Sequence, residues 1–292
     1  MMKEFTLTVE NYMVVPVDKV KKGKFTPATL DCFILDKEDA PASEELRPAI
    51  IICPGGGYEH VSEREGKPVA KRFNSLGFST FVLTYHVAPF EFPSSLCDLA
   101  VAVRMVRKNA AEWGIDPERI AVMGFSAGGH LAASLCVNYK KDWLSSYLDN
   151  AAPEEIMPNA CVLSYPVITS GEFGHQGSFE NLLGMQSDAD KAKKYKQDLV
   201  ELVTLDRHVT EDVPPTFLWH TYEDSCVPVE NSLLYLTSLI DKGVLAEFHM
   251  FPFGCHGLAL ANEETSAGNE DFIQPDCQGW PEMAAKFLDK AM

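Results

Sequence analysis

Residues 120–132, with the sequence IAVMGFSAGGHLA, join a short apolar run to a helical pattern through a glycine-rich turn. The run at 120–123 has the length and composition of a buried strand, and the residues after the turn are helical in character. Between them, residues 124–128 match G-x-S-x-G, in which a serine occupies a sharp turn and glycines let neighbouring backbone pass closely. The pattern predicts that Ser126 is a nucleophile held at the edge of a sheet. The alternative is a tight turn whose glycines serve packing alone.

The rest of the chain alternates apolar runs with helical patterns from about residue 48 onward. Further strands are expected at 49–53, 81–85, 161–163, 216–219 and 246–250, and helices at 69–76, 96–106, 229–242 and 281–290. Asp116 and Pro117 are expected to begin the turn into the strand at 120–123. Such alternation is typical of an α/β fold whose mostly parallel sheet is covered by helices on both faces.

A single domain is expected to span residues 1–292. Short extended segments are expected at 5–9 and 32–35, followed by a polar surface loop at 36–48. Between 170 and 213 the composition changes to glycines, His175 and a lysine-rich polar helix at 188–197. This excursion is longer than a simple connection requires, so it is either a partial lid near the site or a solvated insertion with no gating role.

The charge of the chain bears on its partners. It carries 42 acidic and 25 basic residues, for a formal net charge of −17. This charge disfavours binding to nucleic-acid phosphates and to anionic membrane surfaces, and it mildly favours neutral substrates over polyanionic ones. Neither nucleic acid nor a membrane is therefore expected as a partner.

The cysteines and the amino-terminal segment bear on metal binding and location. The 8 cysteines include no C-x-x-C pair, and several lie in apolar runs, so buried free thiols are expected rather than a metal site. The amino-terminal residues lack the basic and then apolar order of a secretory signal. No segment reaches the roughly 18 consecutive apolar residues of a membrane-spanning helix. A cytoplasmic location is therefore expected.

A serine hydroxyl needs a base that accepts its proton. With a G-x-S-x-G turn the chain order is serine, acid, histidine, so the base is sought after Ser126. His130 lies four residues into the helix and points away from the turn, while His220 and His249 fall within strand runs. His256 follows the last strand in the sequence FGCHG, where a loop at the carboxyl edge of the sheet would carry it. His256 is therefore the predicted base.

The carboxylate that orients the base is sought at the end of the strand at 216–219. Both Glu223 and Asp224 follow that strand in the sequence TYEDSCVP. Asp224 is favoured because it lies deeper in the turn and opens the pattern D-x-x-V-P, but Glu223 remains an alternative.

Backbone N–H groups are expected to bind the oxyanion that forms during acyl transfer. Ala127 provides one N–H because it follows the nucleophile. The glycine run at 55–57 follows the strand at 49–53, and Gly56 and Gly57 are the candidates for a second donor. The run does not fit a dinucleotide loop, because His60 occupies the last glycine position of G-x-G-x-x-G.

Five motifs in this order resemble the bacterial acetyl-xylan-esterase-like α/β hydrolases, which neighbour the hormone-sensitive-lipase branch and often carry a xylanase label. They are PGGGY at 54–58, GFSAGGHLA at 124–132, SYP at 164–166, WHTYEDSCVPV at 219–229 and FPFGCHGLALA at 251–261. The resemblance implies an α/β-hydrolase fold and cofactor-free hydrolysis of carbohydrate or other small acyl esters. It implies a catalytic triad of Ser126, Asp224 and His256, with an oxyanion hole at Gly56, Gly57 and Ala127.

Two positions depart from the pattern of these relatives. Pro54 stands where relatives with an HGGG loop carry histidine, which leaves open which glycine donates to the oxyanion. His86 follows Tyr85 where an arginine is expected.

Small acyl esters, above all acetyl esters of sugars such as xylo-oligosaccharides, are the substrates that the resemblance implies. Tyr58, Phe125 and Tyr165 are candidates for lining the pocket, although aromatic side chains suit core packing equally well. A serine peptidase with the same motif order is a second interpretation, but no segment is long enough for a large substrate-selecting cap. A noncatalytic binding protein on the same scaffold is a third interpretation, although each residue type that a triad requires is present.

Overall fold

The computed structural model describes residues 2–10, 27–35, 46–185 and 195–292. Within these residues, eight strands form one sheet in the order β1-β2-β4-β3-β5-β6-β7-β8. The strands are β1 (Met2–Val9), β2 (Ala28–Leu35), β3 (Arg47–Cys53), β4 (Ser79–Thr84), β5 (Ile115–Phe125), β6 (Ala160–Ser164), β7 (Thr216–Thr221) and β8 (Ala246–Phe251). The strands β4, β3, β5, β6, β7 and β8, which are neighbours in this order, run parallel to one another. The pairs β1–β2 and β2–β4 are antiparallel.

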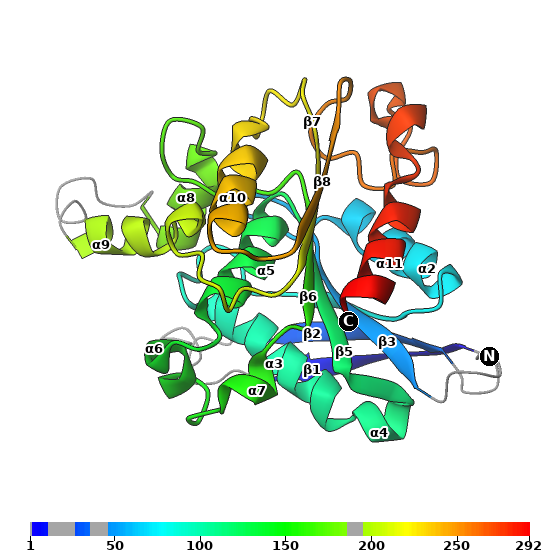
Figure 1. Cartoon of the computed structure of the whole chain (residues 1–292), viewed down its shortest axis with the longest axis vertical. Coiled ribbons are helices and arrows are strands. Elements are labelled where there is room, and N and C mark those ends of the chain that lie inside the picture. The colour runs from blue at the N-terminus through cyan, green and yellow to red at the C-terminus, as the bar shows by residue number, and fades with distance from the viewer. Residues whose placement is uncertain (1, 11–26, 36–45, 186–194) are drawn as a thin grey trace.

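Helices cover both faces of this sheet, with α2 and α11 on one face and α3, α5, α8 and α10 on the other (Figure 1). The helices are α2 (Lys67–Ser75), α3 (Ser94–Lys108), α4 (Ala110–Trp113), α5 (Ala127–Asn138), α6 (Asp142–Ser146), α7 (Pro153–Ile156), α8 (Gln176–Leu183), α9 (Tyr195–Leu202), α10 (Glu230–Asp241) and α11 (Trp280–Ala291). Short 3-10 turns are η2 (Glu63–Glu65), η3 (Leu205–Arg207), η4 (Glu270–Phe272) and η5 (Pro275–Cys277). The predicted sheet with helices on both faces is confirmed.

The strand β3 shows why the central runs are apolar throughout. Alternate side chains of a strand point to opposite faces of the sheet. Ile51 therefore packs in the core layer that contains the α3 helix, whereas Ile50 and Ile52 pack in the layer that contains Phe73 of α2 and Trp280 of α11. Because both faces are covered, neither set of side chains reaches solvent.

The start of β5 differs from the expectation. The strand begins at Ile115, and Asp116 and Pro117 lie within it. Ile115 pairs with Arg47 of β3, but the ladder resumes only at Ile120. Between these two pairs, Asp116 Oδ1 accepts a hydrogen bond from the Glu118 N–H at 3.0 Å, so a side-chain turn interrupts the ladder inside the strand.

Several expectations fall wholly or partly outside the described residues. Most of the polar loop expected at 36–48 lies outside them, and β3 already begins at Arg47. The lysine-rich helix expected at 188–197 lies outside them up to residue 194, and α9 begins within the expected range at Tyr195. The single domain and the partial lid at 170–213 therefore stay predictions. Among the described helices, none is long and apolar enough to cross a lipid bilayer.

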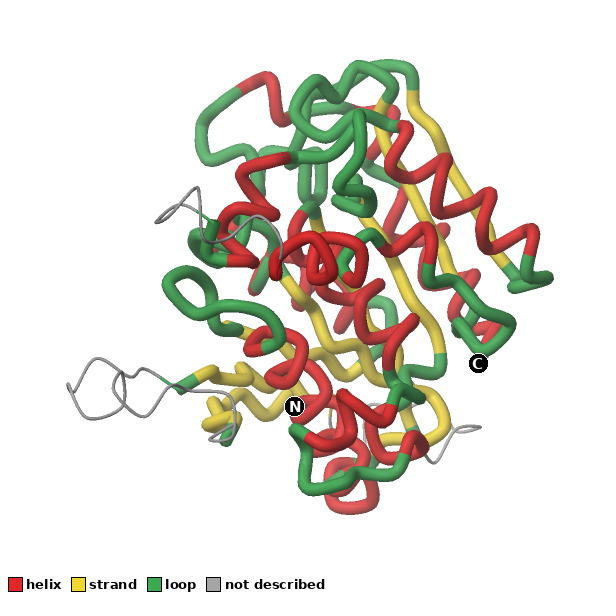
Figure 2. The backbone as a smooth tube through the Cα atoms, turned by 90° about the vertical axis from the view of Figure 1, so that its left-hand side faces the viewer, coloured by secondary structure: helices red, strands yellow, loops and turns green. Residues whose placement is uncertain are grey.

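The parallel strands bring their carboxyl ends to one edge of the sheet, and the segments that follow them meet there. Figure 2 shows loops gathered at the upper end of the molecule, beyond β7 and β8. The segments after β3, β5, β7 and β8 contain the glycine run and all three predicted triad residues. Ligand sites of open α/β sheets lie at this edge.

Candidate active site

Ser126 lies on the turn between β5 and α5. Its backbone has a φ of 53° and a ψ of −121°, a conformation that a side chain rarely adopts. The Ser126 N–H donates to the Ser164 carbonyl at 3.0 Å, which fixes the turn against the end of β6. The residue is only 8% exposed and directly precedes the first turn of α5. The positive end of that helix dipole therefore lies beside the serine.

Two glycines of the turn are required by close backbone approach. A Cβ on Gly124 would lie 2.1 Å from the Gly128 carbonyl oxygen, and a Cβ on Gly128 would lie 2.1 Å from the Cys53 carbonyl oxygen. No side chain larger than hydrogen fits at either position. The turn can therefore pack directly against the end of β3, as the G-x-S-x-G pattern requires.

His256 contacts Ser126 on one side and Asp224 on the other. Its Nε2 lies 2.8 Å from Ser126 Oγ, and its Nδ1 lies 2.6 Å from Asp224 Oδ2. The edge of the His256 ring meets the Tyr165 ring, with centroids 5.1 Å apart. An ionised carboxylate only accepts hydrogen bonds, so Nδ1 carries the proton and Nε2 is free to accept one from the serine.

Asp224, and not Glu223, faces the histidine. Asp224 is 4% exposed, and its Oδ1 accepts hydrogen bonds from the N–H groups of Cys226 at 3.0 Å and Val227 at 2.9 Å. Glu223 is exposed, and its carboxylate makes a long 3.4 Å contact with the Gly254 N–H. The geometry therefore favours the aspartate.

The surroundings of Asp224 hold it in the charged form. Burial pushes the pKa of its carboxyl upward, but hydrogen bonds from His220, His256 and the backbone outweigh burial and keep that pKa well below its usual range. His220 Nε2 lies 2.9 Å from the Val227 carbonyl and 3.3 Å from Asp224 Oδ2, and its Nδ1 lies 2.8 Å from Ser232 Oγ. Sequence reasoning had left His220 aside as a strand residue. Its position four residues before the acid was the available signal.

The glycine run after β3 offers free N–H groups beside Ser126. The Gly55 N–H is already bound to Glu65 Oε2 at 2.8 Å. Gly56 and Gly57 have φ values of 121° and 63°. In the described part of the chain, no acceptor is found for the N–H of either glycine or of Ala127. Gly55 is therefore excluded as an oxyanion donor, and the three N–H groups that the sequence singled out remain available.

The three aromatic residues expected to line a pocket lie in the interior. Tyr58 is 2%, Phe125 0% and Tyr165 1% exposed. The Tyr58 hydroxyl lies 2.8 Å from His130 Nδ1, and Phe125 packs against Tyr165. Such small exposed fractions give no support to the expectation that these side chains line an open pocket.

The two residues that depart from the pattern of the resemblance, Pro54 and His86, both make hydrogen bonds in the interior. The Pro54 carbonyl accepts a hydrogen bond from the Tyr85 hydroxyl at 2.7 Å, which anchors the start of the glycine run. His86 Nδ1 lies 2.7 Å from Asp98 Oδ2 in the interior, and its backbone N–H donates to the same oxygen at 2.8 Å. The histidine therefore pairs with a buried carboxylate.

His175, which belongs to the excursion expected at 170–213, lies close to the site. Its Nδ1 accepts from the Ser178 N–H at 3.3 Å and so caps α8. Burial lowers the pKa of His175, and the nearby His256 lowers it further. The same helix reaches the glycine run, because Asn181 Nδ2 donates to the Gly57 carbonyl at 2.9 Å. The first part of the 170–213 excursion thus borders the site.

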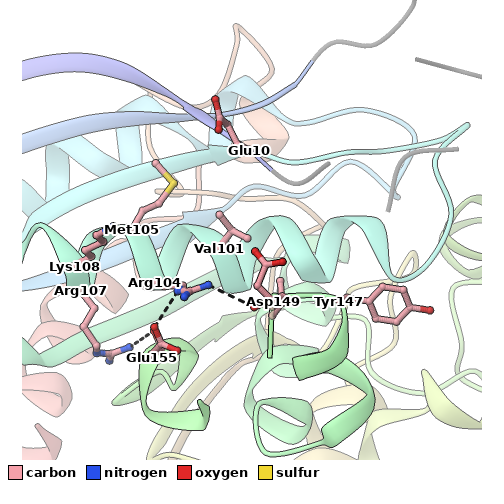
Figure 3. A pocket seen from close by; sticks show the side chains of 10 residues that line it. Glu10, Val101, Arg104, Met105, Arg107, Lys108, Tyr147, Asp149 and Glu155 are labelled. Carbon is pink, nitrogen blue, oxygen red and sulfur yellow. Dashed lines mark hydrogen bonds and ion pairs between the residues drawn. The ribbon is translucent and has the colours of Figure 1, made fainter. Parts of the chain in front are cut away.

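A separate cavity of about 890 Å³ lies beside α3 and includes none of the three predicted triad residues. Its arginines are committed to the protein itself, as Figure 3 shows for Arg104 and Glu155. Arg104 Nε donates to Glu155 Oε1 at 3.0 Å, and Arg107 donates to three backbone carbonyls and to Asn159. These guanidinium groups connect α3 to neighbouring segments.

Metal ligands are not clustered in the part of the chain that the structure describes: no group of three or more histidine, cysteine or acidic side chains that could hold an ion occurs there. All eight cysteines are free thiols, and all except Cys226 and Cys255 are buried. The expectation of buried thiols is therefore confirmed for six of them.

The BD-FAE family model matches residues 35–239. The chain belongs to the BD-FAE family. It is 36% identical over 234 residues to endo-1,4-beta-xylanase B of Butyrivibrio fibrisolvens, and 31% identical over 215 residues to an acetylxylan esterase of Xylanibacter ruminicola. The matched regions cover 76% and 73% of this chain, but the chain spans only 34% and 41% of the lengths of these two relatives.

Solved structures extend the likeness of this BD-FAE chain over its whole length. The acetyl ester-xyloside bifunctional hydrolase of Caldicellulosiruptor lactoaceticus is 38% identical, with a TM-score of 0.77. The match covers 98% of this chain and 96% of that one. Together with the strand order, this likeness confirms the α/β-hydrolase fold and the resemblance drawn from the five motifs.

Proposed function

We propose that this protein is a serine carboxylesterase that hydrolyses short acyl esters through an acyl-enzyme on Ser126. The observation that carries the proposal is the continuous chain of contacts from Ser126 Oγ to His256 at 2.8 Å and from His256 to Asp224 at 2.6 Å. Free N–H groups lie beside it at the glycine run and at the start of α5. A nucleophile, an oriented base and oxyanion donors are the three parts that acyl transfer needs.

The first half-reaction forms the acyl-enzyme. His256 Nε2 takes the Ser126 hydroxyl proton while Oγ bonds to the ester carbonyl carbon. Asp224 holds the imidazole in the required tautomer and stabilises its cation. The carbonyl oxygen becomes an oxyanion that the N–H groups of Gly56, Gly57 and Ala127 bind. When the carbon–oxygen ester bond breaks, His256 gives its proton to the departing alcohol.

The second half-reaction releases the acid. His256 takes a proton from water as that water attacks the acyl carbon, and a second oxyanion occupies the same N–H groups. Collapse of this intermediate breaks the bond to Ser126 Oγ, which recovers its proton from His256. The enzyme returns to its starting state with one ester and one water consumed.

Acetylated sugars are the substrate class that we propose. The relatives named as an acetylxylan esterase and as an acetyl ester-xyloside hydrolase support this choice. A net charge of −17 also suits a neutral sugar ester better than an anionic substrate. A cytoplasmic location, expected from the amino-terminal residues, stays a prediction.

The direct test compares wild type with Ser126→Ala in the hydrolysis of p-nitrophenyl acetate. Loss of the nucleophile should lower kcat by at least about 10⁴-fold. Ser134→Ala is the matched control, because Ser134 is a buried serine of the same helix that contacts His130 and not His256. Equal rates in wild type and Ser126→Ala would end the proposal.

The substrate class needs its own measurement. A rate series over acyl lengths, run beside acetylated xylo-oligosaccharides, should show the highest kcat/KM for acetyl groups. A panel of aminopeptidase substrates tests the peptidase interpretation, which would be favoured if amides were cleaved faster than acetate esters. A noncatalytic protein would fail to label Ser126 with a fluorophosphonate.

A further inference from the structure

Glu65 is a buried carboxylate behind the candidate active site. It belongs to the short turn η2 and is only 4% exposed. Its Oε2 accepts from the Gly55 N–H at 2.8 Å, and its Oε1 accepts from the Tyr165 hydroxyl at 2.8 Å. A buried carboxylate is costly unless its oxygens are hydrogen-bonded, and here each oxygen has a partner on a different segment of the site.

Tyr165 extends this chain to the loop that carries the base. Its hydroxyl oxygen accepts from the Ala259 N–H at 2.8 Å while its proton is donated to Glu65. Ala259 lies three residues after His256, and the Tyr165 ring meets the His256 ring edge. A backbone N–H only donates, so the Tyr165 oxygen accepts from Ala259 and the hydroxyl proton is left for Glu65 Oε1.

Arg64, the neighbour of Glu65 in η2, holds the same loop from another side. Its guanidinium donates to the Gly257 carbonyl at 2.9 Å and to the Thr265 carbonyl at 2.5 Å. The guanidinium carbon also lies 3.8 Å from the centre of the Phe272 ring. Arg64 thus contacts the segment that follows His256 directly, and its neighbour Glu65 reaches the same segment through Tyr165.

The loop needs such contacts because little regular structure fixes it. Between β8 and α11, the chain forms only the short turns η4 and η5. In a strand or helix, backbone hydrogen bonds would fix the position of His256 relative to Ser126. A displacement of about 1 Å in a catalytic group can cost on the order of 10²-fold in rate, so the position of this loop matters to the reaction.

We propose that Glu65 is a positioning residue that couples the glycine run to the His256 loop through the Tyr165 hydroxyl. One oxygen holds Gly55, directly before the two glycines with free N–H groups. The other oxygen holds Tyr165 and, through it, Ala259. One carboxylate thereby fixes the position of the oxyanion donors relative to the base. This inference rests on the proposed function, because it assigns a role within that reaction.

Two conservative substitutions break the chain at different bonds. Glu65→Gln keeps the side-chain size, but if its oxygen keeps the Gly55 N–H, its NH₂ faces the Tyr165 hydroxyl, whose proton then loses its acceptor. Tyr165→Phe keeps the ring on His256 and removes only the hydroxyl. Each variant should lower kcat for p-nitrophenyl acetate by about 10- to 100-fold with little change in KM, because the reacting groups are misplaced while the substrate pocket is intact.

The double variant separates coupling from general damage. If both residues act through one chain, the kcat of the double variant Glu65→Gln with Tyr165→Phe should lie no more than about threefold below the kcat of the less active single variant. Asn74→Ala is the control, because Asn74 is a buried residue whose side chain bridges the Phe33 and Phe78 carbonyls away from the site. It should lower the melting temperature without lowering kcat. Multiplicative losses, or a fall in kcat of Asn74→Ala as large as that of Glu65→Gln, would overturn the proposal.

Amide hydrogen exchange tests the coupling independently of ester hydrolysis. Amide hydrogen exchange at Ala259 should accelerate at least about tenfold in Glu65→Gln, although Glu65 does not touch Ala259, and exchange at Gly55, whose N–H is bound to Glu65, should accelerate in Tyr165→Phe. If wild type hydrolyses no ester, the proposed function fails while this readout still decides the coupling. Unchanged exchange at Ala259 in Glu65→Gln would overturn it even in an active esterase.

Discussion

Replacing Asp224 by asparagine should nearly abolish catalysis and leave the fold in place. Asp224 Oδ2 lies against two imidazole groups, those of His256 at 2.6 Å and His220 at 3.3 Å. If the asparagine NH₂ takes that place, donors oppose donors. His256 then accepts at Nδ1 and carries its proton on Nε2, where it can no longer take the serine proton. Such a tautomer change costs about 10⁴-fold in kcat, or about 5.4 kcal/mol of barrier.

In the alternative placement the amide oxygen faces the histidines, but the NH₂ group then takes the position of Oδ1, where it is unfavourable. There the NH₂ would face the N–H groups of Cys226 and Val227, which now bind Oδ1 at 3.0 and 2.9 Å. A buried donor left without an acceptor costs about 1–3 kcal/mol. Asp224→Asn should therefore also lower the unfolding free energy by about that amount.

Glu223→Gln is the matched control, because it makes the same chemical change one residue earlier. Glu223 is exposed, and the amide oxygen can keep its 3.4 Å contact with the Gly254 N–H. Its kcat should stay within about twofold of wild type, as expected for a surface substitution worth at most about 0.5 kcal/mol. Both variants are assayed with p-nitrophenyl acetate and by urea unfolding. Equal losses in the two variants, or more than about one tenth of wild-type kcat in Asp224→Asn, would refute the assignment.

Two further predictions concern stability. Gly128→Ala should cost at least about 3 kcal/mol in urea unfolding, since its Cβ would lie 2.1 Å from the Cys53 carbonyl, whereas Gly177→Ala, whose Cβ meets its nearest atom at 3.6 Å, should cost nothing. Burial lowers the pKa of His130 to about 4, below its value of about 6.5 in the unfolded chain. The folded protein therefore favours the neutral imidazole, and the stability that this contributes above about pH 6.5 is lost as the pH falls towards 4. Between pH 7 and 5 the loss should be about 2 kcal/mol. An unchanged pH dependence in His130→Gln would contradict this.

The nucleophile turn could be predicted from the sequence because its causes are local. A strand pattern, a glycine-bounded serine and a helical pattern follow one another within residues 120–132, and steric rules for so tight a turn act between near neighbours. The order of serine, acid and histidine along the chain follows from the strand order. The start of β5 was missed because an interruption by the Asp116 side chain resembles a turn that precedes a strand.

The choice between adjacent residues needed the tertiary structure. Glu223 and Asp224 are both carboxylates after the same strand, and only the rotation of the backbone in that turn directs one of them towards His256. Similarly, Gly55 looks like its two neighbours in sequence, but its N–H is already bound to Glu65. Such selections depend on side-chain direction, which composition and spacing do not encode.

Residues 120–132 therefore predicted a serine at the edge of a sheet, and the alternation of strands and helices from about residue 48 onward predicted that the sheet is mostly parallel. The surroundings of that serine were decided by contacts between distant segments: Tyr165 meets Glu65 across 100 residues, and His256 meets Ser126 across 130. No local periodicity relates such positions, because their proximity results from packing of the whole sheet and its loops.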